Sequence, residues 1–254
     1  MSENRNIIEL IDIYKAFGAQ QVLKGLNLGI PKGQTTVIIG RSGGGKSVML
    51  KHMIGLIKPD QGQVMVGGGD IVRMSDHQLN QVRRRFGMLF QEAALFDSMT
   101  VMDNVAFPLR EHTNLKEKQV REVVSEKLAM VGLPGVEHKM PSELSGGMRK
   151  RVGLARAIAL EPEIILYDEP TTGLDPPLSA AINRLIADTQ EKLGVTSVVI
   201  SHDIEGAYQV GQNIAMLYHG KIIAQGTPDQ IRDSSDEVVQ QFIHGRPEGP
   251  IDVI

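Results

Sequence analysis

The sequence contains no cysteine among its 254 residues. It therefore forms no disulfide and binds no metal through thiolates, and this absence agrees with a reducing cellular compartment. No stretch approaches the roughly 18 apolar residues of a membrane span, and the N-terminal residues lack the apolar core of a signal peptide. These absences predict a cytosolic chain that does not itself cross a bilayer.

An excess of positive charge is also missing, since 27 lysines and arginines stand against 30 acidic residues, for a net charge of −3. Nucleic acid is therefore not an expected partner. No internal repeat or low-complexity tract occurs. The hydrophobic fraction of 41% is that of an ordinary globular protein, and the length allows a substantial core.

One short segment carries most of the functional information. Residues 40–47 have the sequence Gly-Arg-Ser-Gly-Gly-Gly-Lys-Ser, the spacing of a phosphate-binding loop. Its glycines let backbone N–H groups approach phosphate oxygens, Lys46 supplies a charge for the β- and γ-phosphates, and Ser47 offers a hydroxyl to Mg²⁺. An expected strand at 35–39 and helix at 47–56 flank the loop, so a helix N-terminus points at an anion. The segment predicts nucleotide binding by Gly40, Arg41, Ser42, Gly43, Gly44, Gly45, Lys46, Ser47 and Val48.

The order of apolar patterns predicts an α/β fold. Within residues 1–91, strand patterns occur at 7–13, 22–30, 63–66 and 86–90. Residues 92–160 contain helical patterns at 116–131 and 146–160 and no convincing strand. Strands and helices then alternate again, with a strand at 164–167, a helix at 178–193, a strand at 195–200, a hairpin over 213–217 and 221–224, and short helices beyond. The expected organisation is a core of 1–91 and 161–243, a helical subdomain at 92–160 and an extended tail at 244–254.

A carboxylate pair follows the strand at 164–167. Mg²⁺ held by phosphates favours a carboxylate at the end of a neighbouring strand, which is the position of Asp168. Glu169 beside it can accept a proton from a water aligned on the γ-phosphate, or orient that water. An Asp-Glu pair alone is more often a solvated strand end, so this interpretation depends on the phosphate-binding loop upstream.

A second glycine pair begins the helix expected at 146–160. The sequence there is Leu144-Ser145-Gly146-Gly147-Met148. Ser145 as an N-cap is a sufficient structural explanation. The functional alternative is a second anion site, in which Ser145 and the N–H groups of both glycines face phosphate.

These segments together resemble the ATP-binding cassette family, the motor subunits of ABC transporters, over nearly the whole chain. The resemblance implies a P-loop NTPase cassette with a RecA-like parallel-sheet core, an N-terminal antiparallel β subdomain and a helical insertion. It also implies that the ring of Phe17 stacks on adenine and that His202 contacts the γ-phosphate. In the family's terms, Gln91 is the Q-loop glutamine and Asp175 is the D-loop aspartate. In this family's pattern Lys46, Glu169 and His202 serve hydrolysis, and Ser47, Gln91 and Asp168 surround Mg²⁺.

Two positions depart from the common family pattern. Met148 replaces the usual glutamine of the signature, which puts a side-chain contact near the partner's ribose in question. Val48 replaces a frequent threonine and so removes a hydroxyl near the α-phosphate. We expect modest changes in nucleotide affinity, with hydrolysis retained.

The resemblance implies assembly as well. In such proteins the signature faces the nucleotide of the opposite subunit, so we expect a head-to-tail homodimer enclosing two ATP, with Ser145, Gly146, Gly147 and Met148 acting in trans. The segments 89–96, 107–113 and 141–143 look like the ATPases of MCE-type phospholipid transporters. That resemblance implies a membrane permease, an MCE-type lipid-binding protein and a small STAS-like regulatory subunit as partners, at the cytoplasmic face of the inner membrane.

Several alternatives stay open at this point. One is the ATPase of an amino-acid or other small-solute importer. Another is a soluble cassette ATPase of DNA repair or translation, which the single signature and the lack of sustained heptads disfavour. A non-hydrolysing regulatory cassette is disfavoured because Glu169 and His202 are both present. For the tail, an unstructured end stands against docking of Phe242, Ile243 and Ile251 on the other subunit.

Overall fold

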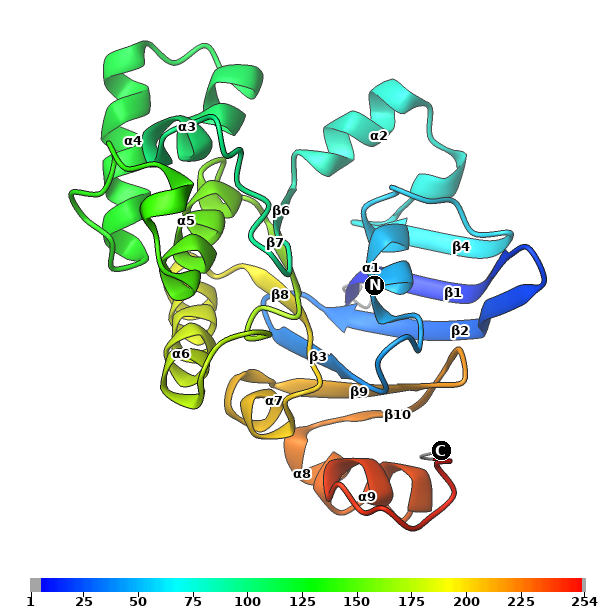
Figure 1. Ribbon diagram of the computed structural model, residues 1–254. Coiled ribbons are helices and arrows are strands. Elements are labelled where there is room, and N and C mark those ends of the chain that lie inside the picture. The colour runs from blue at the N-terminus through cyan, green and yellow to red at the C-terminus, as the bar shows by residue number, and fades with distance from the viewer. Residues whose placement is uncertain (1–5, 253–254) are drawn as a thin grey trace.

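The computed structural model describes residues 6–252, which form two β-sheets surrounded by helices (Figure 1). The four-stranded sheet is antiparallel, with the strand order β2-β1-β4-β5. Its strands are β1 (Asn6–Phe17), β2 (Gln20–Pro31), β4 (Gln61–Val66) and β5 (Gly69–Asp70). This sheet is the antiparallel subdomain that the family resemblance implies.

The six-stranded sheet has the order β10-β9-β3-β8-β7-β6 and is parallel except for β10, which runs antiparallel to β9. Every residue of β3 and β8 is buried, as expected for parallel strands covered on both faces. Because the carboxyl ends of parallel strands meet at one edge, the loops after β3, β7 and β8 converge there. The strands are β3 (Thr35–Ile39), β6 (Phe86–Leu89), β7 (Ile164–Asp168), β8 (Thr196–Ile200), β9 (Asn213–Tyr218) and β10 (Lys221–Gly226).

Helices flank this sheet, and α3, α4 and α5 gather on the side of the molecule away from the antiparallel sheet (Figure 1). The α-helices are α1 (Lys46–Met53), α2 (Asp76–Arg83), α3 (Val101–His112), α4 (Glu117–Met130), α5 (Gly146–Ile158), α6 (Pro176–Leu193), α7 (Ile204–Val210), α8 (Pro228–Arg232) and α9 (Glu237–Ile243). In residues 6–252, none of the helices has both the length and the apolar character that crossing a membrane requires.

The central sheet separates two hydrophobic cores. Ile38 of β3 belongs to the core shared by the antiparallel sheet and α1. Its neighbours Val37 and Ile39 belong to the core under α3–α6. Since side chains alternate along a strand, β3 contributes to both cores and α1 packs between the two sheets. The loop from β3 to α1 is therefore anchored at both ends.

Three α-helices differ from the sequence-based expectation. No helix is expected at 76–83, 101–112 or 204–210, yet these segments are helical as α2, α3 and α7. Pro108 lies inside α3, and proline ordinarily counts against a helix interior. The start of α2 carries a capping box between Ser75 and Gln78, a signal from which this helix could have been predicted.

The C-terminal tail folds back on its own subunit. Residues 244–252 form no helix or strand, but Ile251 is 5% exposed and packs into the core. The side-chain amide of Gln241 in α9 donates to the carbonyl oxygen of Ile251 (3.1 Å) and accepts from its N–H (2.6 Å). An unstructured end and docking on the partner are the two expected arrangements. The contacts of Gln241 with the backbone of Ile251 differ from an unstructured end, and docking on the partner stays a prediction.

Candidate functional site

The loop between β3 and α1 has a backbone that only glycine fits at two positions. Gly40 and Gly45 have φ of +150° and +99°. A Cβ on Gly40 would overlap the carbonyl oxygen of Leu217, and one on Gly45 would lie 2.8 Å from Val22 Cγ1. Gly45 is the N-cap of α1 and caps it with no side chain. The first N–H groups of α1 are therefore left for an anion.

Lys46, the first residue of α1, is 4% exposed. Its ammonium donates to the carbonyl oxygens of Gly40 (2.8 Å) and Arg41 (3.0 Å) and lies 3.8 Å from Glu169 Oε1. Burial lowers the pKa of Lys46, while the charges of Glu169 and Asp168 oppose that shift. A buried ammonium needs such partners, and here the loop itself supplies them.

Ser47 and Asp168 form a pair across the junction of α1 and β7. Ser47 Oγ donates to Asp168 Oδ1 over 3.1 Å. Burial raises the pKa of Asp168 and the charge of Glu169 adds to the rise, whereas the Ser47 hydrogen bond and the charges of Lys51 and Lys46 oppose it. A hydroxyl and a carboxylate held together at a strand end are the hard oxygen donors that Mg²⁺ prefers, so the pair fits this ion.

Gln91, the third expected metal ligand, stands apart from this pair. It follows the edge strand β6, its side chain is exposed, and its carbonyl oxygen accepts a hydrogen bond from Lys150 Nζ of α5. Within residues 6–252, no hydrogen bond joins Gln91 to Ser47 or Asp168. The structure thus brings together two of the three expected ligands.

Glu169 connects three loops at the carboxyl edge of the sheet. Its Oε2 accepts from Thr172 Oγ1 (2.9 Å) and lies 3.1 Å from His202 Nδ1, while Oε1 faces Lys46. The residue has a left-handed backbone, with φ of +48°, and its N–H donates to the carbonyl oxygen of Ile200. The expected trio of Lys46, Glu169 and His202 therefore forms one cluster. A carboxylate in this position can orient a water molecule and take its proton.

Thr172 is a residue of this cluster that the sequence analysis does not identify. It lies three residues after Glu169, and its N–H donates to the carbonyl oxygen of Glu169 over 3.2 Å. A hydroxyl at this spacing within a turn can reach back to the side chain that opens the turn. The Thr171-Thr172-Gly173 sequence was the available signal.

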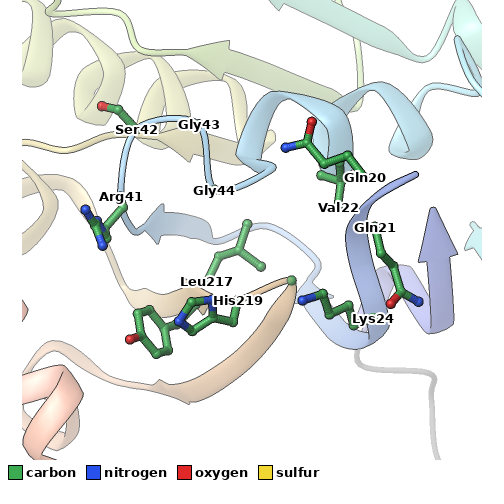
Figure 2. Close-up of a pocket in the computed structure, with 12 residues that line it drawn as sticks. Gln20, Gln21, Val22, Lys24, Arg41, Ser42, Gly43, Gly44, Leu217 and His219 are labelled. Atoms are coloured by element: carbon green, nitrogen blue, oxygen red, sulfur yellow. The ribbon is translucent and has the colours of Figure 1, made fainter. Parts of the chain in front are cut away.

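An open pocket adjoins the outer face of the phosphate-binding loop (Figure 2). Its other walls come from the start of β2 and from the β9–β10 hairpin. Lys24 of β2 extends toward His219 of the hairpin (Figure 2). Lys24 and Arg41 contribute positive charge, and no carboxylate is among the twelve described residues that line it. Val22 and Gly43 also line a second pocket that contains Lys46, Ser47, Val48 and Glu169. The two pockets together surround the loop with groups suited to a polyanion.

Phe17 ends β1 and remains accessible. Its ring is 49% exposed, and Lys15 Nζ lies 5.6 Å from the ring centroid. Phe17 pairs with Gln20, which lines the open pocket, so an exposed ring here suits stacking on a base, the role that the resemblance implies.

The signature segment lies at the N-terminus of α5, and Ser145 is its N-cap. Ser145 Oγ accepts from the N–H of Met148 over 3.3 Å, and Ser145 is exposed. Gly146 lies near Leu174 of the loop before α6 and Gly147 lies near Leu178 in the first turn of α6, since a Cβ on either glycine would be 3.5 Å from that leucine. Within the described residues, no hydrogen bond joins 144–148 to 40–48. The segment is therefore not part of the cluster in its own chain.

Asp175, the expected D-loop aspartate, is exposed and caps the next helix. Its Oδ1 accepts from the N–H of Leu178 at the start of α6 over 3.0 Å. Because Leu174 and Leu178 also touch the glycines of the signature, the D-loop and the signature form one continuous surface.

Comparison with known proteins identifies the family. A model described as "ABC transporter" matches residues 23–172. The chain is 45% identical over 248 residues to the intermembrane phospholipid transport system ATP-binding protein MlaF of Haemophilus influenzae, covering 98% of this chain and 94% of that protein. It is 46% identical to the probable ribonucleotide transport ATP-binding protein mkl of Mycobacterium tuberculosis, covering 96% of this chain and 68% of that protein.

A solved structure agrees in fold. It is the dimeric, post-hydrolysis state of an ATP-binding cassette bound to ADP and Pi, with a TM-score of 0.80 and 33% identity over 87% of this chain and 98% of that one. The chain therefore belongs to the ABC transporter family and forms its ATP-binding, ATP-hydrolysing cassette.

Proposed function

We propose that this cassette powers the movement of phospholipid between membranes, as the ATPase subunit of a transporter with a membrane permease and an MCE-type lipid-binding protein. The observation that carries the proposal is the reciprocal, nearly full-length similarity to the MlaF protein of Haemophilus influenzae, at 45% identity. The mkl protein has a similar identity, but this chain spans only 68% of its length. Agreement over both whole chains favours the phospholipid assignment.

In the proposed reaction the residues of the cluster have separate roles. The phosphates bind to the N–H groups around Gly43 and Gly45 and to the ammonium of Lys46. They replace the two carbonyl oxygens to which Lys46 donates in this structure. Glu169 orients the attacking water and takes its proton. Thr172 and His202 hold one oxygen of Glu169, so that the other faces the phosphate-binding loop.

Ser47, Asp168 and Gln91 would hold Mg²⁺, which supplies charge neutralisation at the phosphates when bound. Ser47 and Asp168 already share a hydrogen bond. Gln91 has to move with the segment after β6 to join them, since its side chain is exposed. We propose that the segment after β6 and the helical subdomain of 92–160 make this movement together.

Two copies complete the site. Ser145 is exposed at the N-terminus of α5, which has no acidic residue in its first turn. This helix N-terminus, with the N–H groups of Gly146 and Gly147, suits the γ-phosphate bound by a second copy. Asp175 lies on the same surface. We therefore propose a head-to-tail homodimer with two composite sites, associated with the permease at the cytoplasmic face of the inner membrane. A small STAS-like subunit is a further proposed partner.

The test is purification of the cassette together with its membrane permease. We expect co-purified phospholipid, identified by mass spectrometry, and ATP hydrolysis that depends on the permease. Placing a charge at Leu95, which packs at the edge of the core near the exposed Phe96, should uncouple the two subunits. A Leu95→Glu subunit should still bind ATP alone. A lipid-free complex whose ATPase responds to an amino acid or a ribonucleotide with its binding protein would overturn the proposal.

A further inference from the structure

Two cationic side chains of α5 hold the segment 91–94, which follows β6. Lys150 Nζ donates to the carbonyl oxygen of Gln91. The guanidinium of Arg156 donates to the carbonyl oxygens of Ala93 and Ala94, both at 2.7 Å. Ala93 and Ala94 have left-handed backbones, with φ of +60° and +47°. This bend turns the carbonyl groups of the segment toward the helix.

The contact between α5 and this segment is close as well as polar. A Cβ on Gly153 would lie 2.8 Å from Leu89 Cδ1 and 3.1 Å from Ala93 Cβ. Gly153 lies between Lys150 and Arg156 in the sequence of α5, so the helix backbone rests directly on the end of β6. The segment 91–94 and α5 can therefore be treated as one mechanical unit.

Lys150 is the more informative of the two cations because it is buried beside the nucleotide site. It is 5% exposed, and within residues 6–252 its ammonium donates one hydrogen bond, to Gln91. Burial lowers the pKa of Lys150, and the charges of Glu92 and Glu169 oppose that shift. A buried ammonium with a single carbonyl acceptor keeps that acceptor, because losing it would leave a buried charge without a hydrogen-bond partner.

The same helix begins with Ser145. Ser145 and Lys150 are five residues apart in one helix, a separation of about 7.5 Å at the usual rise of about 1.5 Å per residue. Gln91 serves the nucleotide held by its own subunit, and Ser145 serves the nucleotide held by the partner. The hydrogen bond from Lys150 to Gln91 is thus a direct connection between a residue of one site and a residue of the other.

We propose that Lys150 is a positioning residue that couples the two nucleotide sites of the dimer through α5. When Gln91 moves toward a nucleotide in its own subunit, the Lys150 hydrogen bond moves α5 with it and changes where Ser145 meets the second nucleotide. Binding at one site then favours closure at the other, and by linkage the reverse holds. The inference rests on the composite homodimer proposed above and is independent of the transported molecule.

The experiment measures ATP hydrolysis against ATP concentration in the purified permease–cassette complex. The wild-type complex should show a Hill coefficient clearly above 1, and Lys150→Met should lower it to about 1 and reduce kcat about tenfold, a loss of coupling in the usual range. Lys118→Met is the matched control, because Lys118 is exposed on α4 of the same subdomain. Lys150→Arg, which keeps the charge and the donor, should restore most of the cooperativity.

A structural role alone predicts a different pattern. Affinity of the isolated subunit for a non-hydrolysable ATP analogue should be the same in wild type and Lys150→Met, because the phosphate-binding loop is untouched. If Lys150→Met does not fold, Lys150→Gln, which is polar but too short to reach Gln91, takes its place. Wild-type cooperativity in these variants, or a loss of analogue affinity that matches a loss of stability, overturns the inference. A hyperbolic wild-type response overturns it too, while leaving phospholipid transport untouched.

Discussion

Lys46, Asp168 and Glu169 come from two separate loops, yet their charges affect one another. Burial raises the pKa of Asp168, and the neighbouring Glu169 adds to the rise; burial lowers the pKa of Lys46. Each of these pKa shifts means that the folded chain holds the charged form of the side chain at some cost in free energy. Bound phosphates and a cation supply the missing opposite charges. The cluster is thus arranged for a ligand and is less favourable without one.

Glu169→Gln should abolish turnover and leave ATP binding intact. The change keeps the shape of the side chain but removes the charge that accepts a proton, so hydrolysis by the complex should fall at least about 100-fold. Phosphate release measures the rate, and calorimetry with ATP measures binding. Glu191→Gln, at an exposed position of α6, is the matched control. Near-normal hydrolysis by the Glu169 variant would remove this residue from the proposed chemistry.

Asp168→Asn should stabilise the ligand-free subunit at neutral pH while eliminating hydrolysis. An acid whose pKa is raised on folding binds more protons in the folded chain, so stability falls as the pH rises from the ordinary carboxyl value of 3.8 through the raised value. The amide removes this cost. Each kcal/mol gained should raise the Tm by about 2–4 °C in a domain of this size.

The stabilisation by Asp168→Asn should be smaller near pH 4, close to the ordinary carboxyl pKa of 3.8, because the folded-state carboxyl with its raised pKa takes up its proton first as the pH falls. Scanning calorimetry at both pH values without nucleotide tests this. Asp233→Asn, at an exposed position after α8, is the control. An equal Tm for wild type and variant at neutral pH would mean that burial of Asp168 carries no cost.

At the scale of elements, the strands and the phosphate-binding loop follow from local patterns, which is why sequence alone predicts them. The cluster of Lys46, Glu169 and His202 follows from the rule that parallel strands end at one edge. Helix α3 was not predicted because Pro108 lies inside it. The helix buries Val101, Val105 and Leu109 in the core, and the buried side chain of Asn104 makes four hydrogen bonds to the backbone of 96–100. Such tertiary contacts outweigh the local effect of Pro108.

The C-terminal tail is a second feature that local sequence patterns predict only in part. Its proline and glycine content correctly indicates the absence of helix and strand, but the burial of Ile251 depends on Gln241, ten residues earlier. No periodic pattern marks a pair of this kind. Likewise, the exposed side chain of Gln91 depends on how α5 holds its carbonyl group, which a motif does not reveal.

Gln241→Ala should weaken the docking of the tail on its own subunit. The buried N–H and carbonyl groups of Ile251 would lose their partners, which should cost about 1–3 kcal/mol of unfolding free energy. Urea unfolding of the isolated subunit measures the change. Gln209→Ala, at an exposed site of α7, is the control. A loss seen only in the assembled complex would instead support docking of the tail on the partner.

At the scale of the whole molecule, each chain carries two sets of candidate site residues. The cluster around Glu169 lies at the carboxyl edge of the sheet. The signature and Asp175 form no hydrogen bond to the phosphate-binding loop in residues 6–252. The solved relative bound to ADP and Pi is a dimer, which supports the proposal that two copies complete the site.

Ser145→Arg should separate folding from assembly. The residue is exposed at a helix start, so the isolated subunit should fold and bind ATP normally, while the arginine blocks closure on the partner's nucleotide. Hydrolysis by the complex should fall at least about 100-fold, the scale expected when a phosphate-site donor is lost. Ser142→Arg, three residues upstream and exposed, should have little effect. Full activity in dimers carrying one mutant subunit would contradict the composite site.

The carbonyl groups that hold Lys46 also influence how spent nucleotide leaves. When ADP departs, an ammonium that had lost its only partners would be stranded in the interior, and that penalty would slow the departure. Here the oxygens of Gly40 and Arg41 lie 2.8 and 3.0 Å away and can take over the hydrogen bonds at once. These two carbonyl groups therefore keep the Lys46 ammonium hydrogen-bonded while ADP is exchanged for ATP, a step that the ATPase repeats in every cycle.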